Sequence, residues 1–80
     1  METRVAALAI IVENTESVEK LNAILHEYGT FIIGRMGVPY RERGINVITI
    51  AVDAPQDTIS ALAGKVGALN GVTVSTALSK

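Results

Sequence analysis

The sequence contains no cysteine and a single histidine, His26. Without thiolates the chain can form neither a disulfide framework nor a thiolate-held zinc site or iron–sulfur cluster. A metal site would need carboxylates or symmetry-related chains, and we expect no metal and no other cofactor. Polar residues surround His26 on one flank of a predicted helix, so we expect it to face solvent rather than act as a ligand or proton carrier.

Aromatic residues are scarce, at 4% of 80 residues, although the hydrophobic share is 49%. The core therefore consists mainly of Val, Ile, Leu and Ala. We treat residues 1–80 as a single domain, and a domain this short buries only about 60–65% of the surface that its unfolded chain exposes. Self-association would add to this thin core.

Neither sign of charge is in excess, because seven Lys and Arg oppose eight Asp and Glu for a net charge of −1. The chain thus lacks the field that general nucleic-acid or anionic-lipid binding requires. Its longest apolar run, Val5 to Val12, has eight residues, whereas a membrane helix needs roughly 20. The run also lacks the flanks of a signal peptide. We expect a cytoplasmic protein that contacts neither DNA nor a membrane.

The first third of the chain predicts a strand followed by a helix. Val5 to Val12 is typical of a strand buried on both faces. From Thr15 the apolar residues follow a helical stripe, with Asn14 or Thr15 as the N-cap and Gly29 as the residue that ends the helix. The stripe comprises Val18, Leu21, Ile24, Leu25 and Tyr28.

Two further β-prone runs, Phe31 to Ile33 and Ile45 to Val52, predict an antiparallel hairpin around the segment between them. A second helix opens at Asp53-Ala54-Pro55 and carries Asp57 near its positive end. Ile59, Leu62, Ala63, Val66 and Leu69 form its apolar stripe.

Glycines punctuate the last third of the chain. Gly64 and Gly67 each cost the second helix up to about 1 kcal/mol relative to alanine, which indicates close packing or early fraying. Asn70-Gly71 predicts a turn into a last strand over Val72 to Leu78.

The order strand, helix, strand, strand, helix, strand predicts an α+β, ferredoxin-like βαββαβ fold. Ile11-Val12-Glu13 corresponds to Ala51-Val52-Asp53 at an offset of 40 residues, as expected for two similar halves. Right-handed crossovers place both helices on one face of a four-stranded antiparallel sheet. The first strand is apolar on both faces, so the other sheet face predicts a homodimer or higher homo-oligomer, most simply a two-fold dimer.

Catalysis finds little support in the sequence. Glu13 and Asp53 occupy equivalent strand ends in the two halves, which suggests an acid/base pair at one edge of the sheet. The stronger interpretation is that each carboxylate meets the positive end of the helix that follows it. No serine has a histidine at a useful spacing. We expect no catalytic residues and no enzyme activity.

Three of the four arginines lie in the segment from Gly34 to Gly44. Guanidinium groups bind carboxylate or phosphate through paired hydrogen bonds, and glycines permit close backbone approach. The segment is a solvated hairpin tip, a protein contact or a site for a small anion, and it lacks the lysine and helix of a phosphate loop. The candidate ligand- or partner-binding residues are Arg35, Gly37, Tyr40, Arg41 and Arg43.

The whole chain resembles the family of proposed iron-only hydrogenase system regulators. The residues that carry the resemblance are concentrated in Arg35-Met36-Gly37-Val38-Pro39-Tyr40-Arg41-Glu42-Arg43-Gly44 and Ala61-Leu62-Ala63-Gly64-Lys65-Val66-Gly67. The family is similar in fold to ACT domains and to the ligand-binding half of nickel-responsive repressors, which are ferredoxin-like modules that dimerise and sense small molecules.

The resemblance implies a non-catalytic regulatory module that binds a small ligand or a protein. The alternative is an accessory protein in metalloenzyme maturation that acts by protein contact alone. The nickel-responsive relatives bind nickel through histidines and a cysteine and carry a separate DNA-binding segment. Here only His26 remains and we expect no such segment, so neither nickel sensing nor direct DNA binding is carried over.

Overall fold

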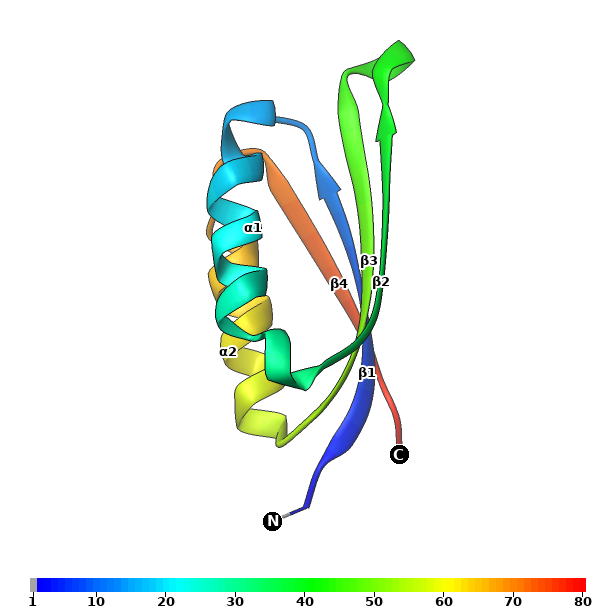
Figure 1. Cartoon of the computed structure of the whole chain (residues 1–80), viewed down its shortest axis with the longest axis vertical. Helices are drawn as coiled ribbons and strands as arrows, with labels where there is room; N and C mark the ends of the chain where they lie inside the picture. The colour runs from blue at the N-terminus through cyan, green and yellow to red at the C-terminus, as the bar shows by residue number, and fades with distance from the viewer. Residues whose placement is uncertain (1) are drawn as a thin grey trace.

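Strands and helices alternate along the chain in the predicted order (Figure 1). The computed structural model describes residues 2–80. Its strands are β1 (Arg4–Val12), β2 (Ile32–Tyr40), β3 (Ile45–Ala54) and β4 (Val72–Leu78), and its helices are α1 (Val18–Glu27) and α2 (Gln56–Gly67). Single 3-10 turns occur at Thr15–Ser17, Gly29–Phe31 and Arg41–Arg43.

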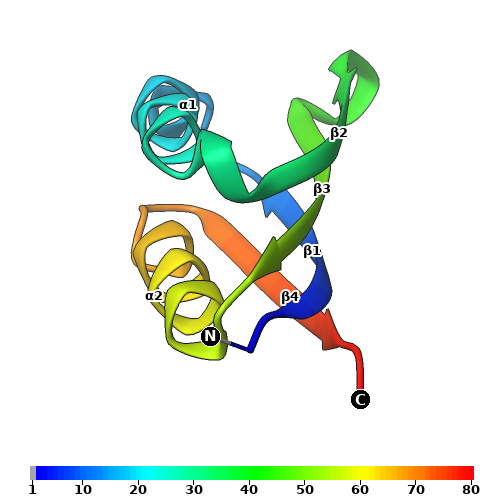
Figure 2. The ribbon, with the colours of Figure 1, turned by 60° about the horizontal axis from the view of Figure 1, so that its bottom comes forward.

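The strands form one sheet in the order β2-β3-β1-β4, and every neighbouring pair is antiparallel. The central pair runs from Arg4 opposite Ala54 to Val12 opposite Asn46. Both helices lie on the same face of this sheet (Figure 2). The ferredoxin-like prediction is therefore confirmed.

The core lies between the helices and one face of the sheet. In β1 the even-numbered residues Ala6, Leu8, Ile10 and Val12 are buried, whereas Val5, Ala7 and Ala9 are exposed. The helices complete this core with Leu21 and Leu25 of α1 and with Ile59, Leu62 and Val66 of α2. Within a single chain the helices cover only one side of β1, so burial of its other face depends on the expected second copy.

The first helix differs from the prediction at both ends. Residues Thr15–Ser17 form a 3-10 turn, and Asn14 Oδ1 accepts a hydrogen bond from the Glu16 amide at 3.0 Å. Gly29 follows α1 but does not adopt the left-handed conformation common after a helix, since its φ is not positive. The chain instead tightens into the 3-10 turn Gly29–Phe31, which holds Phe31 beside the buried Tyr28 with ring centroids 6.5 Å apart.

The second strand is much longer than predicted. β2 continues from Ile33 to Tyr40, so the tip of the hairpin is only the turn Arg41–Arg43 and Gly44, whose φ is 65°. β2 is an edge strand that pairs only with β3, and it therefore tolerates Pro39, which has no N–H, and a register shift between Ile32 and Gly34.

A corner between the two halves of the chain requires a glycine. Gly71 has φ 71°, and a Cβ there would lie 2.6 Å from the Asn14 Cβ and 2.9 Å from its backbone nitrogen. The Glu13 amide donates to the Gly71 carbonyl at 2.7 Å, and Ser17 Oγ, in a buried side chain, donates to the Asn70 carbonyl at 2.6 Å. These bonds join the β1–α1 connection to the α2–β4 turn.

The two glycines of α2 play different parts. A Cβ at Gly67 would lie 3.2 Å from Val74 Cγ1 of β4, whereas a Cβ at Gly64 would meet nothing within 4 Å. The helix continues through Gly64 and ends at Gly67, two residues before Leu69 of the predicted stripe. Close packing is therefore confirmed at Gly67, and Gly64 does not interrupt α2.

Gly71→Ala should lower the free energy of unfolding by more than about 2 kcal/mol. Left-handed backbone alone costs a residue with a Cβ about 1–2 kcal/mol, and the new methyl group would press against Asn14. Urea unfolding measures the loss. Gly44→Ala is the matched control, because it has the same positive φ but open space around its Cβ. Equal losses in the two variants would contradict the role assigned to the Asn14 contact.

Ser17→Ala should cost about 1–2 kcal/mol of stability, because it removes the donor to the Asn70 carbonyl in a partly buried corner. Ser60→Ala, at an exposed position of α2, should stay within about 0.5 kcal/mol of the parent. Thermal or urea unfolding of both variants tests this, and a Ser17 variant as stable as the parent would refute it.

Candidate functional site

Arg35 lies on the helix-facing side of β2. It stands opposite the buried Ile50 in the sheet, and its Nη2 donates a hydrogen bond of 2.7 Å to Asn22 Oδ1 on α1. The guanidinium thus bridges the edge strand and the first helix while remaining exposed. Sequence analysis did not identify Asn22, because its role depends on the extension of β2 past Ile33.

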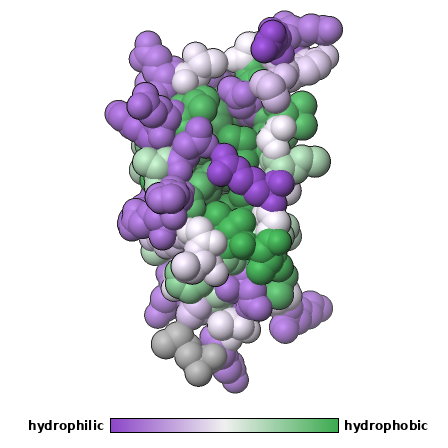
Figure 3. Space-filling model, in the orientation of Figure 1, coloured by the Kyte–Doolittle hydropathy of each residue, from purple (hydrophilic) through white to green (hydrophobic). Residues whose placement is uncertain are grey.

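Gly37 is the next residue on the same side of β2, opposite Ile48. A Cβ at this position would meet nothing within 4 Å, so the helix-facing backbone beside Arg35 is uncovered. Figure 3 shows hydrophobic surface between the first helix and the β2–β3 edge, with hydrophilic side chains crossing it.

Arg41 and Arg43 lie in the tight turn at the hairpin tip, which projects beyond the rest of the sheet (Figure 1). Both are exposed, and neither forms a salt bridge within residues 2–80. Tyr40 also belongs to this tip: its hydroxyl donates to Glu42 Oε2 at 3.2 Å. Glu42 therefore engages the tyrosine rather than an arginine.

The structure does not bring the three arginines together. Arg35 precedes Tyr40 by five residues of strand, or about 17 Å, and it faces the helices whereas the other two lie at the tip. The five predicted residues thus divide into a first set, Arg35 and Gly37, joined by Asn22, and a second set, Tyr40, Arg41 and Arg43.

The proposed pairing of Glu13 and Asp53 is wrong. Asp53 stands opposite Val5, at the opposite end of β1 from Glu13, which follows Val12. The two carboxylates are about eight residues of strand apart, or roughly 27 Å. Because β1 and β3 are antiparallel, equivalent ends of the two halves lie at opposite ends of the sheet. They cannot share a proton or a substrate within one chain.

Lys65 ties the two helices together on the solvent side. Its Nζ lies 3.1 Å from Glu27 Oε2 and 5.1 Å from the centre of the Tyr28 ring. The hydrogen bond to Glu27, followed by the contact with Tyr28, raises the pKa of Lys65 above its usual value. Both charged groups are exposed, so the pair adds little stability. His26, in the last turn of α1, is exposed as predicted.

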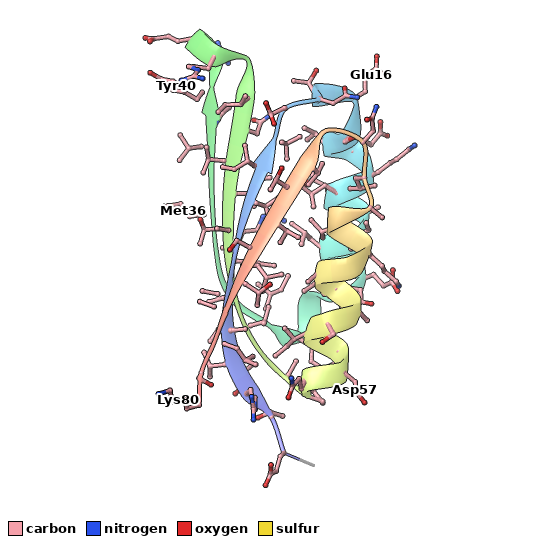
Figure 4. The ribbon with its side chains drawn as sticks, turned by 180° about the vertical axis from the view of Figure 1, so that it is seen from behind. Glu16, Met36, Tyr40, Asp57 and Lys80 are labelled. Atoms are coloured by element: carbon pink, nitrogen blue, oxygen red, sulfur yellow. The ribbon has the colours of Figure 1, made fainter. Side chains whose placement is uncertain are left out.

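The sheet side that faces away from the helices, called here the free sheet face, is apolar. Residues that stand opposite one another share a side of the sheet, so the register defines it. Its members are Val5, Ala7, Ala9, Ile11, Gly34, Met36, Val38, Tyr40, Ile45, Val47, Thr49, Ala51, Thr73, Ser75 and Ala77, with the carboxylate of Asp53 opposite Val5 at one end. Figure 4 shows Met36 and Tyr40 pointing away from the helices. The predicted second apolar face is confirmed.

Two other features of the described residues bear on function. No three His, Asp or Glu side chains gather in an arrangement that would hold a metal ion. Neither α1 nor α2 is long and apolar enough to cross a membrane.

Comparison with solved structures supports the fold. The ACT domain of GTP pyrophosphokinase from Chlorobium tepidum matches with a TM-score of 0.75 and 19% identity, over 96% of this chain and 89% of that one. A nitrogen regulatory PII-like protein from Thiomonas intermedia, bound to ADP, AMP and bicarbonate, matches with a TM-score of 0.54 and 19% identity over the full length of both chains. At these identities the likeness is one of fold.

Two comparisons identify the family. Protein TM1266 from Thermotoga maritima matches with a TM-score of 0.94 and 35% identity, over 99% of this chain and 100% of that one. No curated protein matches. The model of the TM1266-like family, whose members are proposed iron-only hydrogenase system regulators, matches residues 4–76. The chain therefore belongs to the TM1266-like family.

Proposed function

We propose that this protein is a non-catalytic regulatory module of an iron-only hydrogenase system, which binds a small ligand and works as a homodimer in the cytoplasm. The observation that carries the proposal is the free sheet face, which carries apolar side chains from all four strands and faces away from both helices. The role proposed for the family and the ACT-like fold support it.

The free sheet face supports self-association because it exposes large apolar side chains. Met36 is 61% exposed, and Val38 and Tyr40 are each 44% exposed. Burial of apolar surface contributes about 25 cal/mol per Å², and a thin core gains from it. The β2 edge is less suited to pairing, because Pro39 and the irregularity after Ile32 interrupt it.

The two arginine sets offer sites for an anionic ligand. Arg35 presents a guanidinium next to the bare backbone of Gly37, and Asn22 holds it in place. Arg41 and Arg43 present two more at the tip. Carboxylates, phosphates and bicarbonate match the planar donor geometry of arginine. The compounds bound by the PII-like neighbour are therefore suitable probes.

Regulation by this module runs through another protein. The net charge of −1 provides no field for DNA, so any effect on transcription requires a partner that binds DNA. A partner can contact the helices while the free sheet face is occupied by a second copy.

A thermal-shift screen with amino acids, nucleotides, phosphate and bicarbonate should reveal a stabilising ligand. A ligand at 100 times its Kd adds about 2.7 kcal/mol, which for a domain of this size raises Tm by roughly 10 °C or more. Arg35→Ala should abolish the shift if the ligand binds beside Gly37, and Arg41→Ala/Arg43→Ala should abolish it if the ligand binds at the tip.

Lys20→Ala, which removes an exposed cation on α1 away from both sets, is the matched control and should retain the shift. If no compound stabilises the protein, the ligand-sensing part of the proposal fails. Co-purification of a maturation factor with the tagged protein would then favour the accessory role that acts by protein contact.

Met36→Lys should convert the dimer to a monomer, because it places a charge among the large apolar side chains of the free sheet face. Sedimentation equilibrium at micromolar concentration measures the mass. Ala23→Lys, at an exposed position of α1, adds the same charge to the opposite layer and should leave the dimer intact. A parent protein that sediments as a monomer would refute the dimer.

A further inference from the structure

The side chains of the free sheet face change in size from one edge to the other. β2 contributes the large residues Met36, Val38 and Tyr40, whereas the three β4 residues at this face are Thr73, Ser75 and Ala77. The middle of β1 is also low, with Ala7 and Ala9. The face is therefore raised along β2 from Met36 to Tyr40 and low along β4 and the middle of β1.

Two copies can meet face to face in two ways with strands aligned. A two-fold axis parallel to the strands lays β2 of one copy on β4 of the other, so that large residues meet small ones. An axis across the strands lays β2 on β2 in opposite directions, so that the two bulky β2 edges meet and the two small β4 edges are left apart. Interfaces pack as densely as protein interiors, which favours the axis parallel to the strands.

The charges at the two ends of the sheet favour the same axis. The tip arginines lie at the end where β1 runs into Glu13. Tyr40 and Glu16 lie toward this end in Figure 4, whereas Lys80 lies at the other end, on the side of the free sheet face. An axis parallel to the strands keeps like ends together and brings the tip of one copy toward the partner's Glu13. The crosswise axis brings the tip to the far end of the partner's β2 and β3, where the nearest carboxylate is Asp53.

The register gives the distances along the strand. Ile50 stands at the centre of the β1–β3 pairing, and Arg43 lies seven residues from it toward the tip. Glu13 is level with Ile45, which lies five residues from Ile50 in the same direction. With the sheets centred on each other, Arg43 then lies about two residues, or 7 Å, past the partner's Glu13. The crosswise axis leaves it about four residues, or 14 Å, past the partner's Asp53.

We propose that the second copy covers the free sheet face with its β2 over β4, about an axis parallel to the strands, and that Arg41 and Arg43 of each copy pair with the partner's Glu13. This inference rests on the proposed dimer and specifies its geometry. The hairpin tip is then part of the interface, and each arginine pair is completed by a residue of the other chain.

Charge reversal tests the geometry by sedimentation equilibrium at low ionic strength, where exposed ion pairs are least screened. Arg41→Glu/Arg43→Glu should raise the dimer Kd about tenfold or more, because it sets two carboxylates against the partner's Glu13. Adding Glu13→Arg should return the Kd to within about threefold of the parent. Adding Asp53→Arg instead should not restore it. Circular dichroism of each variant verifies folding, which exposed positions should not disturb.

Each outcome supports or overturns the inference. Rescue by Glu13→Arg supports it. Rescue by Asp53→Arg, or a tip reversal without effect on the Kd, overturns this geometry while the sheet-face dimer stands, provided that Met36→Lys still dissociates it. A parent protein that is monomeric overturns the dimer and the geometry together, and it leaves the ligand-sensing proposal to the thermal-shift screen.

Discussion

The two-residue alternation of β1 is the constraint on which the rest of the structure depends. β1 lies between β3 and β4, so its register fixes which residues of both neighbours face the helices. Leu8 and Ile10 are fully buried beneath α1 and α2, while Ala7 and Ala9 face the other way. A slip of one residue would exchange the two sets. It would remove the large side chains from the core, and this penalty keeps the register unique.

Most of the candidate binding residues lie on or next to the edge strand β2, because few of its side chains are buried on either side of the sheet. Its helix-facing side carries Arg35, held by Asn22, and its other side carries Met36 and Tyr40. A central strand could not expose an arginine and a methionine on adjacent residues without losing buried contacts. The same strand therefore serves the proposed ligand site and the proposed dimer interface, so ligand binding and association share one element and can influence each other.

The sequence predicted the fold, but it predicted only part of the candidate functional site. Apolar periodicity is set by burial, and it predicted the element order and the second apolar face, while the right-handedness of the crossovers predicted the shared face of the helices. It missed most of β2, because Gly34, Gly37 and Pro39 weaken the strand signal and only pairing with β3 overrides it. The prediction grouped Arg35 with Arg41 because it missed the length of β2 that separates them. It placed Glu13 near Asp53 because local sequence patterns do not contain the relative direction of two strands.

The placement of β1 at the centre of the sheet has a consequence for how the chain acquires its structure. β1 is synthesised before both of its neighbours in the sheet, and its pairing with β4 joins residues as far apart as Ala6 and Leu78. Closing such long loops costs entropy before the contacts form, which slows folding. The apolar β1 segment of the nascent chain thus keeps an unpaired edge until β4 has been synthesised, and chaperone demand should be greatest during this interval.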